Sequence, residues 1–214
     1  MNFHPNLEGD DRVIREEIDT FWKWFSTNES VLLRSIAESP VGDEIDSRLA
    51  RVSPTLGWEF GPVSQSEKMY FAISPNFDRS RLRLAHKVYV SAYQSELWDF
   101  KLGRQAKPAF DFIDFYLPSL SEVRIFDFSE FTFSISDQNS SGNMSIAFQG
   151  HFSVPVCYSD AVELCELLLI NAVGELIAIS KFESVQYGDT ALEKYGVQRL
   201  PEVVRKMLLA RSAG

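Results

Sequence analysis

The chain has 214 residues, of which 45% are hydrophobic and 13% aromatic, with a net charge of −9 and an isoelectric point near 4.9. This content of large apolar side chains is typical of a folded protein with a sizeable core and argues against disorder. The excess of negative charge opposes binding to nucleic acids and to anionic membranes, because both present negative phosphates. We therefore expect another protein, or a small molecule, as the partner.

Residues 11–38 are predicted to form one long amphipathic helix, because apolar residues recur there at spacings of three, four and seven. These residues are Ile14, Ile18, Phe21, Phe25, Leu32 and Ile36. Proline cannot continue the helical hydrogen bonding, so Ser39-Pro40 should end this helix, and a short helix over 43–52 should follow.

The order strand, strand, helix, strand then occurs twice, over Gly57–Arg104 and over Ile125–Val185. In the first copy, Trp58 and Phe60 alternate with Glu59 as expected of a half-buried strand. In the second copy, the alternation changes phase near residues 129–130, which indicates a bulge or a break between two strands. The closing strand of this copy is expected over 177–185.

The segment 103–124 reads as a connector, and a last helix is expected over 201–211. We predict an α+β fold: an antiparallel-rich sheet built from two similar strand-strand-helix-strand halves, with a long N-terminal amphipathic helix and a short C-terminal helix. The whole chain, residues 1–214, is expected to be a single domain with pseudo-repeats at about 57–104 and 125–185.

The compartment follows from the cysteines and from the start of the chain. Cys157 would lie at the start of a helix and Cys165 inside the same helix, so the two residues would be too far apart to form a disulfide. Two unpaired thiols favour a reducing compartment, and the first residues lack the basic start and apolar run of a signal peptide. No apolar stretch is long enough to span a membrane. These features predict a cytoplasmic protein.

The one dense cluster of basic residues in the sequence lies at the start of the first predicted repeat helix. Arg79, Arg81, Arg83 and His86 lie in its first turns, close to Lys87. Free amide hydrogens and the helix dipole favour an anion at such a place, which makes these four residues a candidate ligand site. The alternative is pairing with neighbouring Asp and Glu, with His86 as an ordinary residue of the apolar face.

The aromatic run at 21–25 is the candidate surface for a partner protein. Trp22 and Trp24 flank the apolar stripe of the long helix on opposite sides, so they are the members expected to be exposed. The alternative is core packing against the sheet. A homodimer formed through the same face of the helix is a further alternative.

Other reactive residues carry no recognisable site. His151 has no partner at metal-ligand spacing, and Cys157 has no histidine near it in sequence. Asp99, Asp111, Asp114 and Asp127 lack the pattern of a calcium loop. We therefore expect no catalytic residue, metal or cofactor.

Several short motifs resemble a group of uncharacterised bacterial proteins, a domain of unknown function. They are the early Phe21–Phe25 cluster, the Trp58–Pro62 strand, the Ile73–Pro75 turn and the later Trp98–Phe100 strand. The resemblance covers mainly the first half of the chain. It implies a bacterial setting and carries over no functional residue.

Charge and the missing chemistry together predict a non-enzymatic protein-binding domain, of an inhibitor or immunity type. The alternative is a domain or weak enzyme that holds a small anionic ligand at the basic helix start, residues 79–87.

Overall fold

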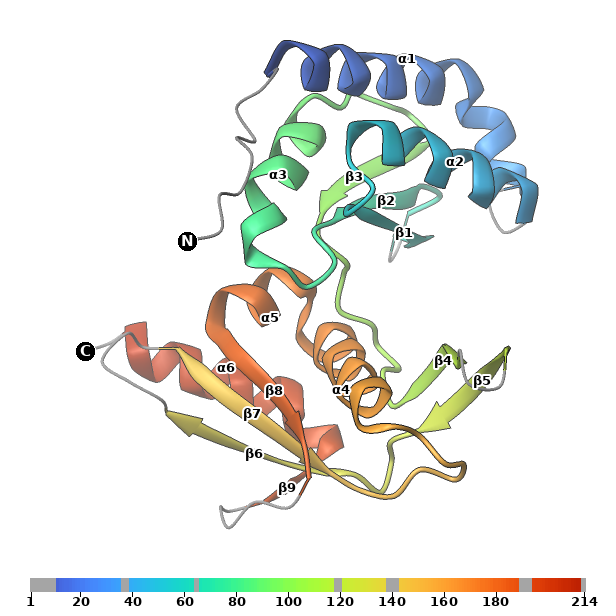
Figure 1. The fold of residues 1–214 in the computed structure, drawn as a ribbon. Coiled ribbons are helices and arrows are strands. Elements are labelled where there is room, and N and C mark those ends of the chain that lie inside the picture. The colour runs from blue at the N-terminus through green and yellow to red at the C-terminus, as the bar shows by residue number, and fades with distance from the viewer. Residues whose placement is uncertain are drawn as a thin grey trace, which may run out of the picture. The chain divides into compact units, whose positions relative to one another are not determined.

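The computed structural model describes residues 11–35, 39–63, 66–117, 121–137, 143–188 and 194–212. It confirms the predicted α+β class, the long N-terminal helix and the shorter C-terminal one (Figure 1). The chain divides into two compact units, residues 1–103 and residues 104–214. Each unit is described by itself below, and the expectation of a single domain over 1–214 stays a prediction.

The first unit places three helices around a three-stranded sheet. Its elements are α1 (Asp11–Ser35), α2 (Ser39–Val52), β1 (Gly57–Pro62), β2 (Met69–Ser74), the 3-10 turn η1 (Arg79–Arg81), α3 (Leu82–Val90) and β3 (Trp98–Leu102). Strand β2 is central, antiparallel to β1 and parallel to β3. A parallel neighbour needs a crossover connection, and α3 supplies it.

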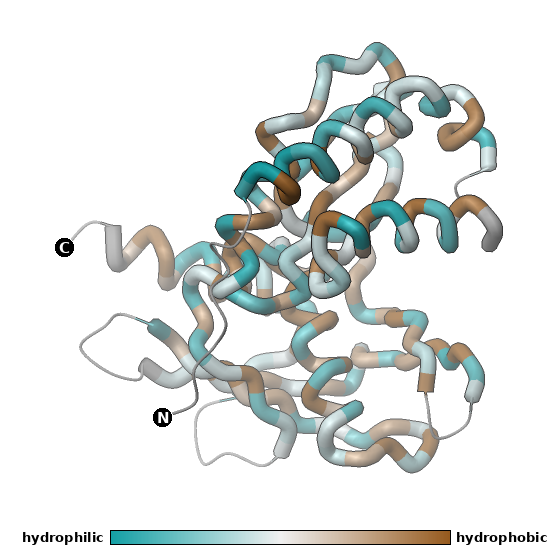
Figure 2. Tube along the Cα trace, turned by 45° about the horizontal axis from the view of Figure 1, so that its top comes forward, coloured by the Kyte–Doolittle hydropathy of each residue, from teal (hydrophilic) through white to brown (hydrophobic). Residues whose placement is uncertain are grey.

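The core of the first unit is aromatic and joins all three helices to the sheet. Phe25 of α1 is fully buried and lies 4.8 Å, between ring centroids, from Phe71 of β2. Ile45 and Leu49 of α2 and Ala85 of α3 belong to the same cluster. Figure 2 shows hydrophobic and hydrophilic residues interspersed along these helices, the pattern of an amphipathic helix.

The second unit contains a hairpin and a larger sheet. Its elements are β4 (Phe112–Leu117), β5 (Glu122–Asp127), β6 (Thr132–Asp137), β7 (Met144–Gln149), α4 (Tyr158–Val173), α5 (Glu175–Lys181), β8 (Phe182–Tyr187), β9 (Tyr195–Gly196), η2 (Val197–Arg199) and α6 (Leu200–Ser212). Strands β4 and β5 pair only with each other among the described residues, and the second sheet has the order β8-β7-β6-β9. Helix α4 contacts β8, β4, α5 and α6 (Figure 1).

The predicted repetition is present in both units. In each, two antiparallel strands are followed by helical structure and by a third strand, which pairs in parallel with the second. The second copy begins at β6, at residue 132, and not at Ile125 as predicted. Residues 122–127 form β5 instead, so the change of phase near residue 129 marks a break between two strands.

Two further predictions about the second unit were wrong. The segment 103–124 is not only a connector, because it holds all of β4 and the start of β5. The predicted strand 177–185 begins later, at Phe182, because residues 175–181 form the short helix α5. Ala178 and Ile179 of α5 are buried, so packing overrides the preference of isoleucine for strands.

Candidate functional site

The basic cluster at the start of α3 is largely committed to contacts within the protein. Asp78 caps η1, since its Oδ1 accepts hydrogen bonds from the backbone nitrogen of Ser80 at 2.8 Å and from its hydroxyl at 2.7 Å. The other oxygen, Oδ2, lies 2.8 Å from Nε of Arg81. The hydrogen bonds from Ser80, together with the charge of Arg81, hold the pKa of Asp78 below its usual value.

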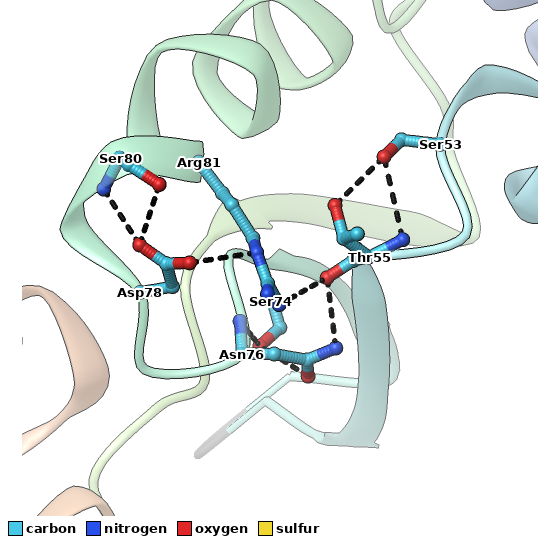
Figure 3. Close-up of polar contacts among 7 residues, drawn as sticks. All are labelled: Ser53, Thr55, Ser74, Asn76, Asp78, Ser80 and Arg81. Carbon is cyan, nitrogen blue, oxygen red and sulfur yellow. Dashed lines mark hydrogen bonds and ion pairs between the residues drawn. The ribbon is translucent and has the colours of Figure 1, made fainter. Parts of the chain in front are cut away.

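Arg81 also ties the start of α3 to the loop before β1. Its guanidinium donates to the backbone oxygen of Thr55 at 3.0 Å, and Asn76 Nδ2 donates to the same oxygen at 3.1 Å (Figure 3). Asn76 and Phe77 both have positive φ, 52° and 56°. The turn after β2 is thus held in an uncommon backbone conformation, and Arg81 is one of the side chains that contact the loop beside it.

The remaining predicted ligands, Arg79, Arg83 and His86, are all exposed. Lys87 Nζ lies 2.7 Å from Asp11 Oδ1, and its hydrogen bond, with a smaller contribution from Arg83, lowers the pKa of Asp11. Arg79 is exposed and has contacts of its own. The prediction that His86 lies on the apolar face was wrong: His86 is exposed, because the buried positions of α3 are Ala85 and Val88.

The aromatic cluster of α1 belongs to the core. Trp22 is 4% exposed, and its indole nitrogen donates to the backbone oxygen of Val88 at 2.8 Å. The expectation that Trp22 is exposed was therefore wrong, because α3 covers it. Trp24 is half-buried and lies under the guanidinium of Arg48, 4.2 Å from the ring centroid. The partner-binding role expected for these two tryptophans stays a prediction, with Trp22 buried and Trp24 partly buried.

Exposed apolar residues gather instead on the outer face of the β4–β5 hairpin. We call this surface the hairpin face, and its residues are Phe112, Asp114, Tyr116, Val123, Ile125 and Asp127. Antiparallel partners share a face of the sheet, so Tyr116 lies beside Val123, Ile125 beside Asp114, and Phe112 beside Asp127. The opposite side of the hairpin holds buried Ile113, Phe115 and Leu117.

The apolar residues of the hairpin face are more than half exposed. The exposed fractions are 57% for Phe112, 54% for Tyr116, 63% for Val123 and 69% for Ile125. Hydrogen bonds from Ser129 lower the pKa of Asp127, so its carboxylate is charged at neutral pH. The surface therefore combines four exposed apolar side chains with negative charge.

A pocket of about 590 Å³ opens in the first unit, beside the end of α3 and the loop that leads to β3. Its aromatic and charged lining consists of Tyr89, Tyr93, Trp98, Phe100, Glu96, Asp99 and Lys68. Glu29 holds two residues of this lining in place, because its Oε2 accepts hydrogen bonds from the hydroxyl groups of Tyr93 and Ser95, both at 2.8 Å. Burial and the contact with Glu29 raise the pKa of Tyr93, so its phenol stays protonated.

Helix α4 carries a carboxyl group with an unusual titration. Burial and, to a lesser extent, the charge of Glu163 raise the pKa of Glu166 from an ordinary value of 4.5 to about 7. A carboxyl whose pKa is raised by folding stabilises the fold fully below its unfolded pKa. This contribution is lost as the pH rises through the folded pKa.

The substitution Glu166→Gln is therefore expected to flatten the dependence of stability on pH. At pH 8 the variant should be more stable than the wild type by about 1 to 2 kcal/mol, after allowance for the solvent that screens a half-exposed group. At pH 4 the two should differ little. Urea unfolding followed by circular dichroism measures both, with Glu183→Gln as the exposed control. Parallel pH profiles for E166Q and the wild type would contradict the assignment.

Searches of the whole chain add no relative to this picture. No protein-family model, curated protein or solved structure matches it. Within the described ranges, no three His, Cys, Asp or Glu side chains are grouped to hold a metal ion. In the same part of the chain, no helix combines the length and apolar character needed to cross a bilayer.

Proposed function

We propose that this chain is a cytoplasmic binding protein that engages another protein through the hairpin face. One observation carries the proposal: four large apolar side chains, each more than half exposed, lie on one side of a two-stranded sheet, where Tyr116 pairs with Val123. Single exposed apolar residues are common on protein surfaces, whereas a contiguous group marks an interaction site. Phe112 and Tyr116 add the aromatic area that dominates binding energies at interfaces.

The charge of this surface specifies the partner's chemistry. Asp114 and Asp127 stand among the apolar residues, and the whole chain carries a net charge of −9. A partner with an apolar patch flanked by Lys and Arg would complement both features, and opposite charges would speed its association. An inhibitor that covers a basic site on another protein fits this chemistry.

The position of the hairpin suits such a role. The inner face of β4 packs on α4, so the outer face is presented by a supported strand pair. The anionic-ligand alternative at residues 79–87 has less support, because Arg81 and Lys87 are paired with Asp78 and Asp11.

A photo-crosslinking amino acid placed at Val123 tests the proposal in the protein's own host cells. We expect crosslinks to one basic protein, and none from the same amino acid at Tyr158, which is 65% exposed but lies outside the hairpin face. The captured protein is then purified and its affinity for the wild-type chain measured by calorimetry. Ile125→Ser and Tyr116→Ser should each weaken binding about tenfold or more, as expected for interface anchors.

Two further results test the role of charge at the hairpin face and the alternative of self-association. Asp114→Asn with Asp127→Asn should slow association and reduce its dependence on salt, leaving dissociation less affected. Crosslinks from Val123 to a second copy of this chain alone would mean that the face forms a homodimer and would overturn the proposal. Equal affinity of the Ile125→Ser variant and the wild type for the captured protein would also overturn it.

A further inference from the structure

The pocket beside the end of α3 has the chemistry of a cation site. Four aromatic residues, Tyr89, Tyr93, Trp98 and Phe100, line it together, and the rings of Tyr93 and Phe100 lie 5.3 Å apart at an interplanar angle of 61°. Aromatic faces carry negative potential and attract cations, above all those with an apolar body that is weakly hydrated. The volume of about 590 Å³ is in the range of small-ligand sites.

Charges in and behind the walls act in the same direction. Glu96 and Asp99 line the pocket, and Glu29 stands behind Tyr93 and Ser95 as their hydrogen-bond acceptor. Lys68 opposes them, but its ammonium group already donates to the backbone oxygen of Ser95 at 2.8 Å.

Two further features complete the charge balance of the pocket. Lys101 Nζ lies 2.7 Å from Asp99 Oδ2 and neutralises that carboxylate. The carboxylates of Glu29, Glu96 and Asp99 and the ammonium groups of Lys68 and Lys101 therefore leave the pocket with a net charge of −1. The pocket also adjoins the C-terminal end of α3, where the helix dipole favours positive charge.

The walls of this pocket are built before any ligand arrives. Trp98 is 2% exposed and lies at the base of β3, with its indole nitrogen 3.3 Å from the backbone oxygen of Glu29. Ser95 accepts hydrogen bonds from the backbone nitrogens of Leu97 and Trp98, at 3.0 and 3.1 Å. A loop fixed in this way loses little freedom on binding, which favours affinity for a small ligand.

We propose that this pocket binds an ammonium group carried on an apolar body, which is the chemistry of a free quaternary ammonium compound or of a methylated lysine side chain. The site lies in the first unit and is independent of the hairpin face, so either proposal stands if the other fails.

The test compares choline with its neutral isostere 3,3-dimethylbutan-1-ol, by NMR titration of the full chain. Choline should shift the amide signals of residues 92–100 and saturate in the millimolar range, and the isostere should bind at least about threefold more weakly. Tyr89→Leu, which keeps an apolar side chain but removes a ring, should weaken choline binding by about threefold or more. Glu96→Gln should weaken it as well, and Glu183→Gln in the second unit should leave it unchanged.

A further titration identifies the source of the ammonium group, and other results would overturn the proposal. A trimethyl-lysine peptide that binds more tightly than choline to the same residues would identify a protein side chain as the source; tighter binding of choline would identify a free small molecule. Equal binding of choline and the isostere, or no shift with choline in the tens of millimolar, would refute the site. Inorganic phosphate that shifts the same signals, and loses this effect in Lys68→Gln, would show an anion site instead.

Discussion

Phe25→Ala is expected to destabilise the first unit by about 3 to 5 kcal/mol, the cost of removing a large buried aromatic side chain and leaving a cavity. Phe25 has no exposed surface, and its ring lies 4.8 Å from Phe71, 5.4 Å from Trp98 and 5.6 Å from Trp22 between centroids. These neighbours come from α1, β2 and β3. Their separate backbones cannot close together around the missing ring, so most of the cavity should remain.

The tryptophans make this loss measurable in one unit. All four, at positions 22, 24, 58 and 98, lie within residues 1–103, so tryptophan fluorescence follows the unfolding of the first unit. Urea unfolding of F25A should show this transition at much lower denaturant. Phe25→Leu, which keeps part of the volume, should cost less, and Phe112→Ala on the hairpin face should leave the fluorescence transition in place. A loss below about 1 kcal/mol for F25A would contradict the described core.

Strand β1 and helix α1 of the first unit could be predicted from the sequence because polar and apolar residues alternate in them with a regular period. Trp58 and Phe60 flank Glu59, and the stripe of α1 recurs with helical spacing, so both periods could be recognised. Asp78, which caps η1, is likewise a residue type favoured at a helix start. These signals depend only on residues close together in the sequence, so they can be recognised without knowledge of the tertiary structure.

The hairpin face was missed for a physical reason. Along β4, Phe112 and Tyr116 point outward while Ile113, Phe115 and Leu117 point inward, so both faces are apolar and only Asp114 interrupts the run. A strand that breaks the usual alternation gives no periodic signal, so the sequence predicts a connector for this segment. The violation itself was the available clue, since apolar residues on an outer face point to a binding role.

Contacts between distant residues could not be predicted from one sequence. The sequence predicts that Arg81 lies at a helix start, close to acidic residues. Its hydrogen bond to the backbone oxygen of Thr55, however, depends on how the turn after β2 packs against the loop before β1. The pocket likewise brings together Lys68, the end of α3 and β3. Nothing in the spacing of Tyr89 and Tyr93 along the sequence shows that they line a pocket.

Glu175→Ala is expected to destabilise the second unit by about 2 to 4 kcal/mol, because it removes the acceptor of a buried hydrogen bond and part of a fully buried side chain. Glu175 is 0% exposed and is the first residue of α5. Its Oε2 accepts from the backbone nitrogen of Arg104 at 2.9 Å, and its own backbone nitrogen donates to the oxygen of Arg104 at 2.9 Å. The pair fixes the start of the second unit to the junction of α4 and α5.

Glu175→Gln separates the acceptor from the charge. The amide oxygen of glutamine can still accept from the Arg104 nitrogen, so a loss less than half that of E175A would assign the stabilisation to hydrogen-bond geometry. Equal losses in both variants would assign it to the negative charge. Both are measured by urea unfolding followed by circular dichroism, while tryptophan fluorescence checks that the first unit is unchanged. Because the bond lies inside the fold, an E175A loss below about 0.5 kcal/mol would mean that water replaces the carboxylate at Arg104.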